Sequence, residues 1–532
     1  MRLQKLQMLL GILLFVIAMG VLALPYYPWG FMRDDYGFLA HAAAYVHGWS
    51  EFFKPHNVVD FVYSSAINPP FSWSGSFYRP IQFIHFALEY LFFGTNAYAY
   101  LIWIVFMHAG IVVSLFSIGR TFFSAQRAFF VALIILLHPM LMLWMGCFTQ
   151  QIYIIDVVYF LSITALLKKF CDTNHWRWYM ASCLLFFVAL FAKETLITYP
   201  GWVFIALIWY LLQCDQLKKW YNQVFPALKI ASGYVFVGIF YLASRYLIFA
   251  GATDGVIKFF GFSSWQAFVA RQSERFFDLV TYVCNYLYIG MVPGGNWLRK
   301  MVLVMLIIGL LAYPFIRKRQ LLLLFFLGFS MLAVTWPAWL LYYHTRYAYA
   351  GLIFLYFIFL FAIDFYLNKF VRLRRISPLL GFCVVAVLGC NAISMQRIKN
   401  SVLSTVTGAA RELAVQVHET VRPLIFIGLP HCWFASGAGQ LVKLFYPQDK
   451  RLVDVGILLF GGEEFGLLSQ HDVRVERRGD LVDIGLAAND NLSFLNHQKE
   501  ERFVSIKLSW ELLTDNAIII TWDYKRHGFR II

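Results

Sequence analysis

AYAYLIWIVFMHAGIVVSLFSI, residues 97–118, is the stretch that decides the fold. It contains no Asp, Glu, Lys or Arg, and it reaches the length of about 20 mostly apolar residues that a helix needs to cross a bilayer. The sequence therefore predicts a mainly α-helical, polytopic membrane bundle of about 11 transmembrane helices. The other ten apolar stretches are 7–24, 127–145, 151–167, 178–195, 199–213, 228–249, 301–316, 320–335, 347–367 and 377–394.

The composition of the whole chain agrees with this pattern and excludes a soluble multidomain enzyme. Hydrophobic residues make up 60% of the 532 residues and charged residues 14%, against about 45–50% and about 25% in globular proteins. The net charge is +15, but residues 396–532 hold 16 of the 44 Lys and Arg and 16 of the 29 Asp and Glu. The excess charge therefore belongs to residues 1–395.

Apolar runs also end near residue 395, so we expect two domains. Residues 1–395 form the transmembrane domain. Residues 396–532 form a small α+β domain, with a helix at 396–420 and strands near 423–428, 451–460, 472–477, 480–486, 501–509 and 516–523. The dipeptide at 479–480, Gly-Asp, suits a hairpin turn between two of these strands.

The positive charges orient the membrane domain. With the N-terminus in the cytoplasm, seventeen Lys and Arg residues in the cytoplasmic segments face only Asp172 and Asp215. Basic residues accumulate on the cytoplasmic side of membrane proteins. An odd number of spans then places residues 396–532 outside. We expect a multi-pass protein of a bacterial inner (plasma) membrane, with its C-terminal domain in the periplasm or outside.

Two other interpretations of the charge and of the first apolar segment are less well supported by the sequence. A nucleic-acid partner is not expected, because no basic stripe with interleaved aromatic residues remains on a soluble face. The first apolar segment could be a cleaved signal peptide, since VLALP offers small residues near its end. We favour an uncleaved helix, because the segment is long for a signal core.

Two long loops lie on the outer side, at about 25–96 and 250–300. Loops of this length in a compact protein are usually functional or disordered, and these two are too apolar for disorder. Residues 80–94, PIQFIHFALEYLFFG, are too few to span the membrane and suit an interfacial helix. We expect the functional site at this outer face.

The first loop opens with FMRDDYGFLAHA, residues 31–42. Asp34 and Asp35 are adjacent carboxylates near a helix end, and their mutual repulsion raises one pKa or attracts a cation. They are therefore candidates for a general base or for a divalent-cation site. Alternatively, the pair caps the N-terminus of a helix that begins at residue 36.

Further charged residues lie in the outer half of the membrane domain. Charges in membrane helices are costly and usually face a cavity or a partner. Lys193 and Arg245 could instead be snorkelling side chains, and Lys193 could form a local pair with Glu194. Taken together, several cations near two acids suit an anionic substrate and a general base. The candidate substrate-binding residues are Arg79, Lys193, Glu194, Arg245 and Arg346.

The order of these motifs resembles the polytopic C-type glycosyltransferases (GT-C). An acidic pair follows the first helix, and YRP, FFGTNAYAYLIWIVFMHAG, LLHPMLMLW, AKETLITYP and TRYAYAGLIFL follow it along the chain. Within that superfamily the resemblance is to the protein O-mannosyltransferase-like branch and to the transmembrane tetratricopeptide mannosyltransferases, without their repeats. It covers roughly residues 1–395.

The resemblance implies a glycosyltransferase of the hexosyl or mannosyl type that uses a polyprenyl-phosphate sugar donor. The acceptor would be a hydroxyl of a protein, glycan or glycolipid on the outer face, and the transfer would invert the sugar. Asp34 or Asp35 would be the base; we favour Asp34, with Asp35 orienting it or binding a cation. Arg346 would hold the carrier phosphate, with Arg79 and Arg245 as weaker candidates for the same role.

The sequence also departs from the family. After His138-Pro139 the mannosyltransferase branch usually has an acid and a GRxDLL-like stretch, but here no acid precedes Asp156, and Gln150 and Gln151 occupy that region. The sugar and the branch are therefore not determined. The competing hypothesis is a transporter or lipid flippase without covalent chemistry, although no internal repeat of the kind common in transporters is present.

Overall fold

The computed structural model describes most of the membrane helices and the strands of the C-terminal region. The described residues are 2–23, 39, 42, 46, 56–57, 76–77, 79–138, 151–214, 221–248, 297–318, 320–321, 323–331, 349, 351–417, 424–429, 453–458, 473–478, 481–486, 492–494, 497–501, 503–507, 518–523 and 528–531.

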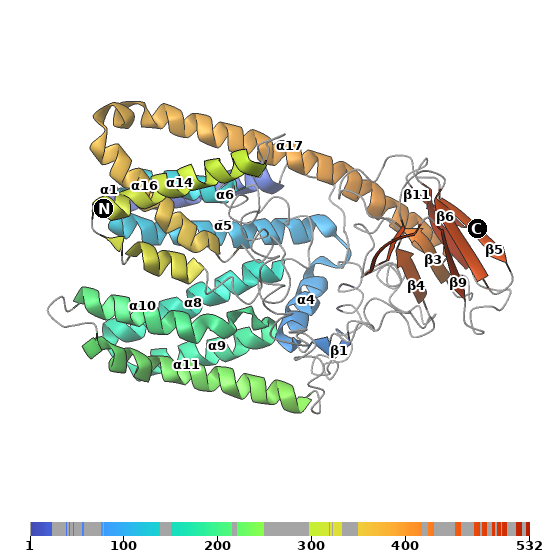
Figure 1. The fold of residues 1–532 in the computed structure, drawn as a ribbon, viewed down its shortest axis with the longest axis horizontal. Coiled ribbons are helices and arrows are strands. Elements are labelled where there is room, and N and C mark those ends of the chain that lie inside the picture. Colours follow the sequence, from blue (N-terminus) through green and yellow to red (C-terminus); the bar gives the residue numbers. More distant parts are fainter. Residues whose placement is uncertain are drawn as a thin grey trace. The chain divides into compact units, whose positions relative to one another are not determined.

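Helices make up most of this part of the chain (Figure 1). In chain order they are α1 (Arg2–Ala18) with the π-helical turn η1 (Met19–Ala23), α4 (Pro80–Phe93), α5 (Ala97–Phe122), α6 (Ala125–Leu136), α8 (Gln151–Thr173), α9 (Trp176–Ala192), the 3₁₀ turn η5 (Glu194–Thr198), α10 (Tyr199–Cys214), α11 (Tyr221–Ile248), α14 (Trp297–Arg317), α16 (Leu352–Lys369) and α17 (Val371–Val417).

Four helical segments in the described residues are long and apolar enough to cross a membrane, namely Ala97–Phe122, Glu194–Leu211, Val224–Ser244 and Leu352–Lys369. Shorter apolar helices lie at Leu9–Leu22, Ala125–Leu136, Trp176–Ala192, Met305–Arg317 and Gly381–Cys390. All of these coincide with predicted apolar stretches. The mainly helical membrane fold is confirmed, and the number of about 11 spans stays a prediction.

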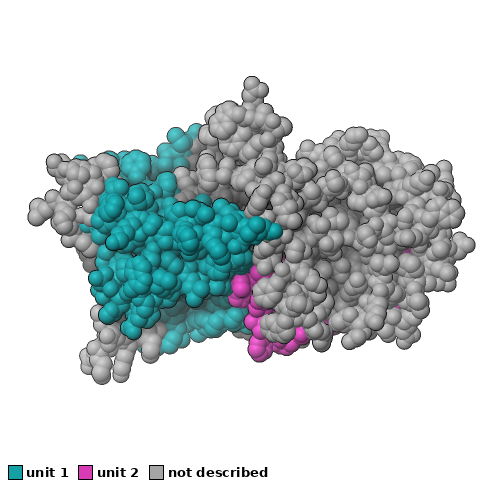
Figure 2. Space-filling model, turned by 90° about the horizontal axis from the view of Figure 1, so that it is seen from below, with its two compact units in different colours: residues 1–25, 102–145, 150–395 teal, residues 26–101, 146–149, 396–532 magenta. Residues whose placement is uncertain are grey.

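The chain divides into two compact units, coloured in Figure 2. The first contains residues 1–25, 102–145 and 150–395, and the second contains residues 26–101, 146–149 and 396–532. Nearly all of the segment predicted as the first long outer loop, residues 25–96, therefore falls in the same unit as the C-terminal residues.

Helices α8, α9, α10 and α11 of the first unit pack side by side (Figure 1). Buried tyrosines fill the space between them, and hydroxyl hydrogen bonds satisfy their polar ends. Tyr234 on α11 lies 2.5 Å from the Ser182 hydroxyl on α9, and Tyr179 on α9 donates to the carbonyl of Ile230 at 2.6 Å. The Tyr199 hydroxyl on α10 lies 3.2 Å from that of Thr164 on α8. Because a buried hydroxyl without a partner is costly, these bonds specify how the four helices meet.

Helix α17 differs from the prediction. Separate helices were expected at 377–394 and 396–420, but the structure has one helix over Val371–Val417. Residues 390–400 contain no Gly or Pro, so nothing in the backbone ends the helix where the composition changes from apolar to polar. At about 1.5 Å per residue, 47 residues extend roughly 70 Å, more than twice a bilayer's hydrocarbon core.

The C-terminal residues form short strands in separate sheets. β3 (Leu424–Leu429) lies between β4 (Val453–Leu458) and β10 (Ile518–Asp523), parallel to both, and β11 (Gly528–Ile531) pairs antiparallel with β10. Each of the six predicted strands overlaps a strand of the structure.

A second sheet is antiparallel and includes β5 (Val473–Arg478), β6 (Leu481–Leu486) and β9 (Phe503–Lys507). In the β5–β6 pair, Arg478 lies opposite Leu481. This register leaves positions 479 and 480 between the strands, as a two-residue hairpin turn requires. The remaining strands form two-stranded ladders: β7 (Leu492–Phe494) with β8 (His497–Glu501), and β1 (His56–Asn57) with β2 (Ser76–Phe77).

Candidate functional site

Charged side chains gather where α9 ends and α8 begins, in the first unit. Helix α9 stops at Ala192, and Lys193 takes an extended conformation with φ −161° and ψ 136°. The chain then turns through η5 into α10. In the predicted orientation this turn lies at the outer face of the membrane, where the sequence predicted Lys193 and Glu194 as site residues.

Lys193 is a buried cation in this turn. It is 3% exposed, and its Nζ lies 2.9 Å from the centroid of the Tyr153 ring on α8. An ammonium group over an aromatic face is attracted by the electrons of the ring. A snorkelling lysine would extend its ammonium group towards water, so the snorkelling interpretation of Lys193 is wrong.

Asp156, one helical turn after Tyr153, adds a buried carboxylate to the same region. It is 4% exposed, and its Oδ2 accepts a hydrogen bond of 2.5 Å from the Thr195 hydroxyl of η5. Gln151, in the first turn of α8, is 1% exposed. Each of the three charged residues here makes at least one further interaction: Asp156, Lys193 and Glu194.

We call Tyr153, Asp156, Lys193, Glu194 and Thr195 the outer charged cluster. The charges of Asp156 and Lys193 are buried between apolar helices, where burying an ion costs several kcal/mol unless partners compensate. Ionisable residues kept at such a cost inside membrane domains usually serve a substrate or ion pathway. The cluster offers a cation for an anionic group and two carboxylates that can accept or orient protons.

Three members of the cluster were not among the predicted site residues: Tyr153, Asp156 and Thr195. The sequence could have indicated Asp156 as a site residue, because it is the single acid within the apolar stretch QIYIIDVVYF, residues 151–160. Tyr153 and Thr195 had none, since an aromatic residue and a threonine are ordinary in apolar helices. Only the packing of α8 against α9 and η5 brings Tyr153 to Lys193 and Thr195 to Asp156.

Arg79 belongs to the second unit and immediately precedes α4. Pro80 occupies the first helical position, which suits a residue without an N–H, and the Arg79 carbonyl accepts from the N–H of Phe83 at 3.2 Å. The Arg79 side chain is half-buried.

Helix α4 buries two polar side chains together with the apolar Phe83 and Phe86, and it exposes other apolar residues near its end. Gln82 is 2% and Glu89 7% exposed, whereas Leu91 and Phe92 are 58% and 81% exposed. Residues 82 and 89 are two turns apart and share one face of the helix. This pattern suits a helix whose apolar side meets lipid.

Four of the seven predicted site residues cannot be placed. Asp34, Asp35 and Arg346 lie outside the described residues. Arg245 lies in α11, but its side chain is also outside them. The cation site predicted at the Asp34/Asp35 pair is therefore untested. Among the described residues, no group of three or more His, Cys, Asp or Glu side chains could hold a metal ion.

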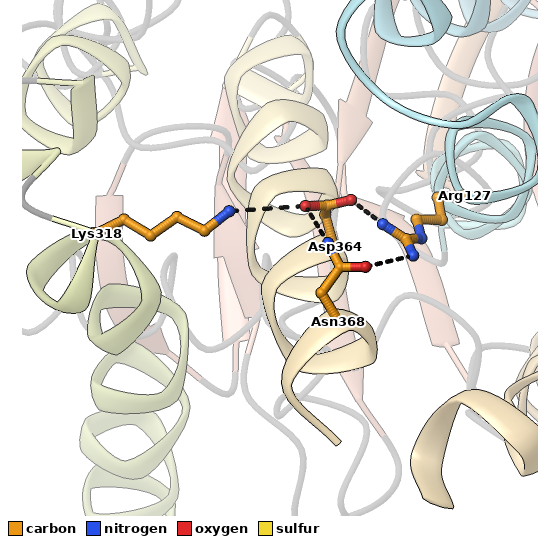
Figure 3. Close-up of polar contacts among 4 residues, drawn as sticks. All are labelled: Arg127, Lys318, Asp364 and Asn368. Carbon is orange, nitrogen blue, oxygen red and sulfur yellow. Dashed lines mark hydrogen bonds and ion pairs between the residues drawn. The ribbon is translucent and has the colours of Figure 1, made fainter. Parts of the chain in front are cut away.

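A second charged group connects residues of α6 and α16 with Lys318, which follows α14, in the first unit (Figure 3). Asp364 of α16 forms an ion pair with Arg127 of α6, and Lys318, which follows α14, lies 3.8 Å from its other carboxylate oxygen. Asn368 accepts from Arg127 at 2.8 Å and donates to Asp364 at 3.1 Å. Arg127 and Lys318 reach the carboxylate from opposite sides. We call these four residues the inner network, and their mutual bonds indicate a structural role.

The sequence matches no known protein family and no curated protein. Among solved structures, the chain is similar to the crystal structure of ArnT from Cupriavidus metallidurans in the apo state. The two share 12% identity with a TM-score of 0.46, over 85% of this chain and 86% of the other. A likeness at this level assigns neither a family nor an activity to the chain.

Proposed function

We propose that the protein is a membrane glycosyltransferase that transfers a sugar from a polyprenyl-phosphate donor to an acceptor hydroxyl at the outer face. The observation that carries this proposal is the outer charged cluster, in which Lys193 and Asp156 are buried between apolar helices. The motif order described above supports the same activity.

The reaction needs a base on one side of the sugar and cations on the other. The acceptor oxygen attacks the anomeric carbon, its proton passes to a carboxylate, and the bond between that carbon and the phosphate oxygen breaks. The polyprenyl phosphate then leaves with the electron pair, and the configuration inverts. A base and preorganised cations lower the barrier of such a step.

We assign the base to Asp34 or Asp35 and the carrier phosphate to Arg346, with Arg79 and Arg245 as further candidates. Lys193 would add positive charge for the phosphate. Asp156, held by Thr195, would balance that charge and fix the turn that carries Lys193.

The test compares variants in a deletion strain. Mass spectra of glycolipids and glycoproteins would identify a product that disappears on deletion and returns with the wild-type gene. We expect Lys193→Met, Asp34→Asn and Asp35→Asn to reduce this product by at least about tenfold at equal protein levels, as expected when a charged group acts in the transition state.

Lys168→Met is the matched control. Lys168 pairs with Asp172 at an exposed position, with 67% and 44% of the two side chains exposed, so its loss should leave the product unchanged. Full activity of all three site variants would contradict the proposed site. Movement of a lipid-linked sugar across liposomes without covalent transfer would favour the transporter hypothesis.

A further inference from the structure

The C-terminal ends of α14 and α16 carry a basic surface that the proposed reaction does not use. Arg317 is the last residue of α14, Lys318 directly follows it, and Lys369 is the last residue of α16. All three side chains are exposed. They belong to the segments predicted to face the cytoplasm, so this surface is separate from the predicted outer site.

Aromatic side chains between the two helices bring the lysines to one place. The centroid of the Phe365 ring lies 5.8 Å from Nζ of Lys318 and 5.7 Å from Nζ of Lys369. Phe365 also packs edge-on against Tyr313 of α14, with 5.9 Å between the ring centroids. Because aromatic faces attract cations, ammonium groups from two different helices are held beside the same ring.

Tyr313 adds a neutral donor to the two lysines. Its hydroxyl accepts a hydrogen bond of 3.2 Å from Nζ of Lys369. A hydroxyl that accepts still has its own hydrogen to donate, and the ammonium group of Lys369 has two further N–H bonds. Tyr313 and Lys369 are both exposed, so these donors can reach a molecule outside the protein.

The positive charge of this surface exceeds the negative charge beside it. Asp364 lies 3.8 Å from Lys318, but its other carboxylate oxygen is already bound by Arg127 (Figure 3). Within the part of the chain that the structure describes, neither Arg317 nor Lys369 forms an ion pair. The surface therefore retains positive charge that an anionic ligand can balance.

An exposed apolar stripe of α14 leads to these charges. Leu306, Leu310, Tyr313 and Arg317 follow one another at spacings of four, three and four residues, so they lie along one face of the helix. All four are exposed. A stripe that is apolar along the helix and ends in a tyrosine and cations matches a phospholipid, which has apolar chains and a charged head group at the bilayer surface. A free anion would leave the apolar part unexplained.

We propose that Tyr313, Arg317, Lys318 and Lys369 bind the phosphate of an anionic phospholipid. The lysines and the Tyr313 hydroxyl donate to the phosphate oxygens, and an acyl chain lies along the α14 stripe. A head group with a net negative charge is preferred, because a zwitterionic one brings a cation of its own to an already positive surface. This inference does not depend on the proposed glycosyltransferase activity.

Native mass spectrometry of the full-length protein in detergent would count the bound lipids and measure their affinities. The probes are dioleoyl phosphatidylglycerol, which is anionic, and dioleoyl phosphatidylcholine, which has the same chains and no net charge. We expect phosphatidylglycerol to fill one site at least about tenfold more tightly than phosphatidylcholine. Lys318→Gln and Lys369→Gln should each weaken its binding about fivefold, the effect of one basic residue at a lipid surface. Tyr313→Phe should weaken it about threefold, as one lost hydrogen bond does.

Lys229→Gln is the matched control. Lys229 is an exposed lysine of another predicted cytoplasmic segment, and it lies on α11, away from α14 and α16 (Figure 1). Its loss should leave phosphatidylglycerol binding within about twofold, because interactions between distant exposed charges are screened. Lys369→Arg keeps the charge and should retain most of the affinity, which separates lost charge from lost packing.

Four outcomes would overturn the proposal. Equal affinities for the two lipids, or equal weakening by Lys229→Gln, would show only a general attraction to anionic lipid. Displacement of phosphatidylglycerol by inorganic phosphate would assign the donors to a free anion. Tyr313→Phe removes one oxygen and no charge, so it tests the site even if a lysine variant fails to fold. Unchanged binding in Tyr313→Phe would show that the hydroxyl does not contact the head group.

Discussion

Gly233 on α11 shows how closely the helices of the first unit approach at single residues. A Cβ added at this glycine would lie 3.0 Å from Cζ of Tyr179 and still nearer to its hydroxyl oxygen. That hydroxyl donates to the Ile230 carbonyl. A methyl group at position 233 must therefore displace Tyr179 from its hydrogen bond.

We expect Gly233→Ala to lower the free energy of unfolding by about 1–3 kcal/mol, because overpacking and the lost hydrogen bond exceed the gain in helix propensity. Thermal unfolding in detergent would measure it. Gly110→Ala on α5 is the control, since nothing lies within 4 Å of a Cβ there. Equal stability of the two variants would contradict the close contact.

The hydrogen bond between Thr195 and Asp156 is a second test at the scale of residues. Thr195→Val keeps the shape of the side chain but removes the hydroxyl that donates to Oδ2 of Asp156. It should cost about 1–3 kcal/mol of unfolding free energy, whereas Thr195→Ser should cost less than about 1 kcal/mol. Chemical denaturation of both variants would show the difference. If valine were tolerated as well as serine, the bond would contribute nothing.

At the scale of elements, the inner network joins three helices through one carboxylate. Asp364 of α16 meets Arg127 of α6 and Lys318 next to α14, and the Asp364 side chain is 14% exposed. Removing its charge leaves Arg127 and Lys318 without the carboxylate that lies between them. Interactions of this kind depend on all members being present.

We expect Asp364→Asn to destabilise the first unit by about 1–3 kcal/mol, as the loss of one partner from a mostly buried ion pair does. The exposed pair of Lys168 and Asp172 is the control, and Asp172→Asn should cost less than about 0.5 kcal/mol. Thermal unfolding with and without Arg127→Met would give the coupling between residues 127 and 364. A coupling near zero would show that the network is not stabilising.

Helix α17 shows, at the same scale, that a change of composition does not by itself end a helix. Composition marks where the surroundings of a chain change, but a helix ends only where the backbone is interrupted or another interaction replaces its hydrogen bonds. The break predicted at residue 395 had no Gly or Pro to cause it. The composition was therefore misleading about where the helix ends.

At the scale of the whole molecule, the orientation remains a prediction from charge. Alkaline phosphatase fused after residue 532 should be active and green fluorescent protein at the same place dark, because the C-terminal residues are expected outside. Fusions after Lys219, in a predicted cytoplasmic segment, should behave in the opposite way. Fluorescence of the fusion at residue 532 would show that the number of spans is even.

The sequence by itself determined the helical membrane fold, because apolar stretches of membrane length allow few other structures in lipid. It also led to Lys193 and Glu194, since charges among apolar residues are conspicuous at any position. It could not lead to the partners of these charges. Lys193 meets Tyr153, and Thr195 meets Asp156, only because α8 packs against α9 and η5.

The tertiary structure alone decided the pairing of Arg127 with Asp364 in the inner network and the hydrogen bond between His108 and Tyr349. The two residues of each pair are more than 200 residues apart. The physical reason is the range of the interactions. The hydrophobicity of a segment is a sum over consecutive residues, so it can be calculated from the sequence alone. A hydrogen bond or ion pair needs two groups within about 3–4 Å, and only the packing of helices determines which groups come that close.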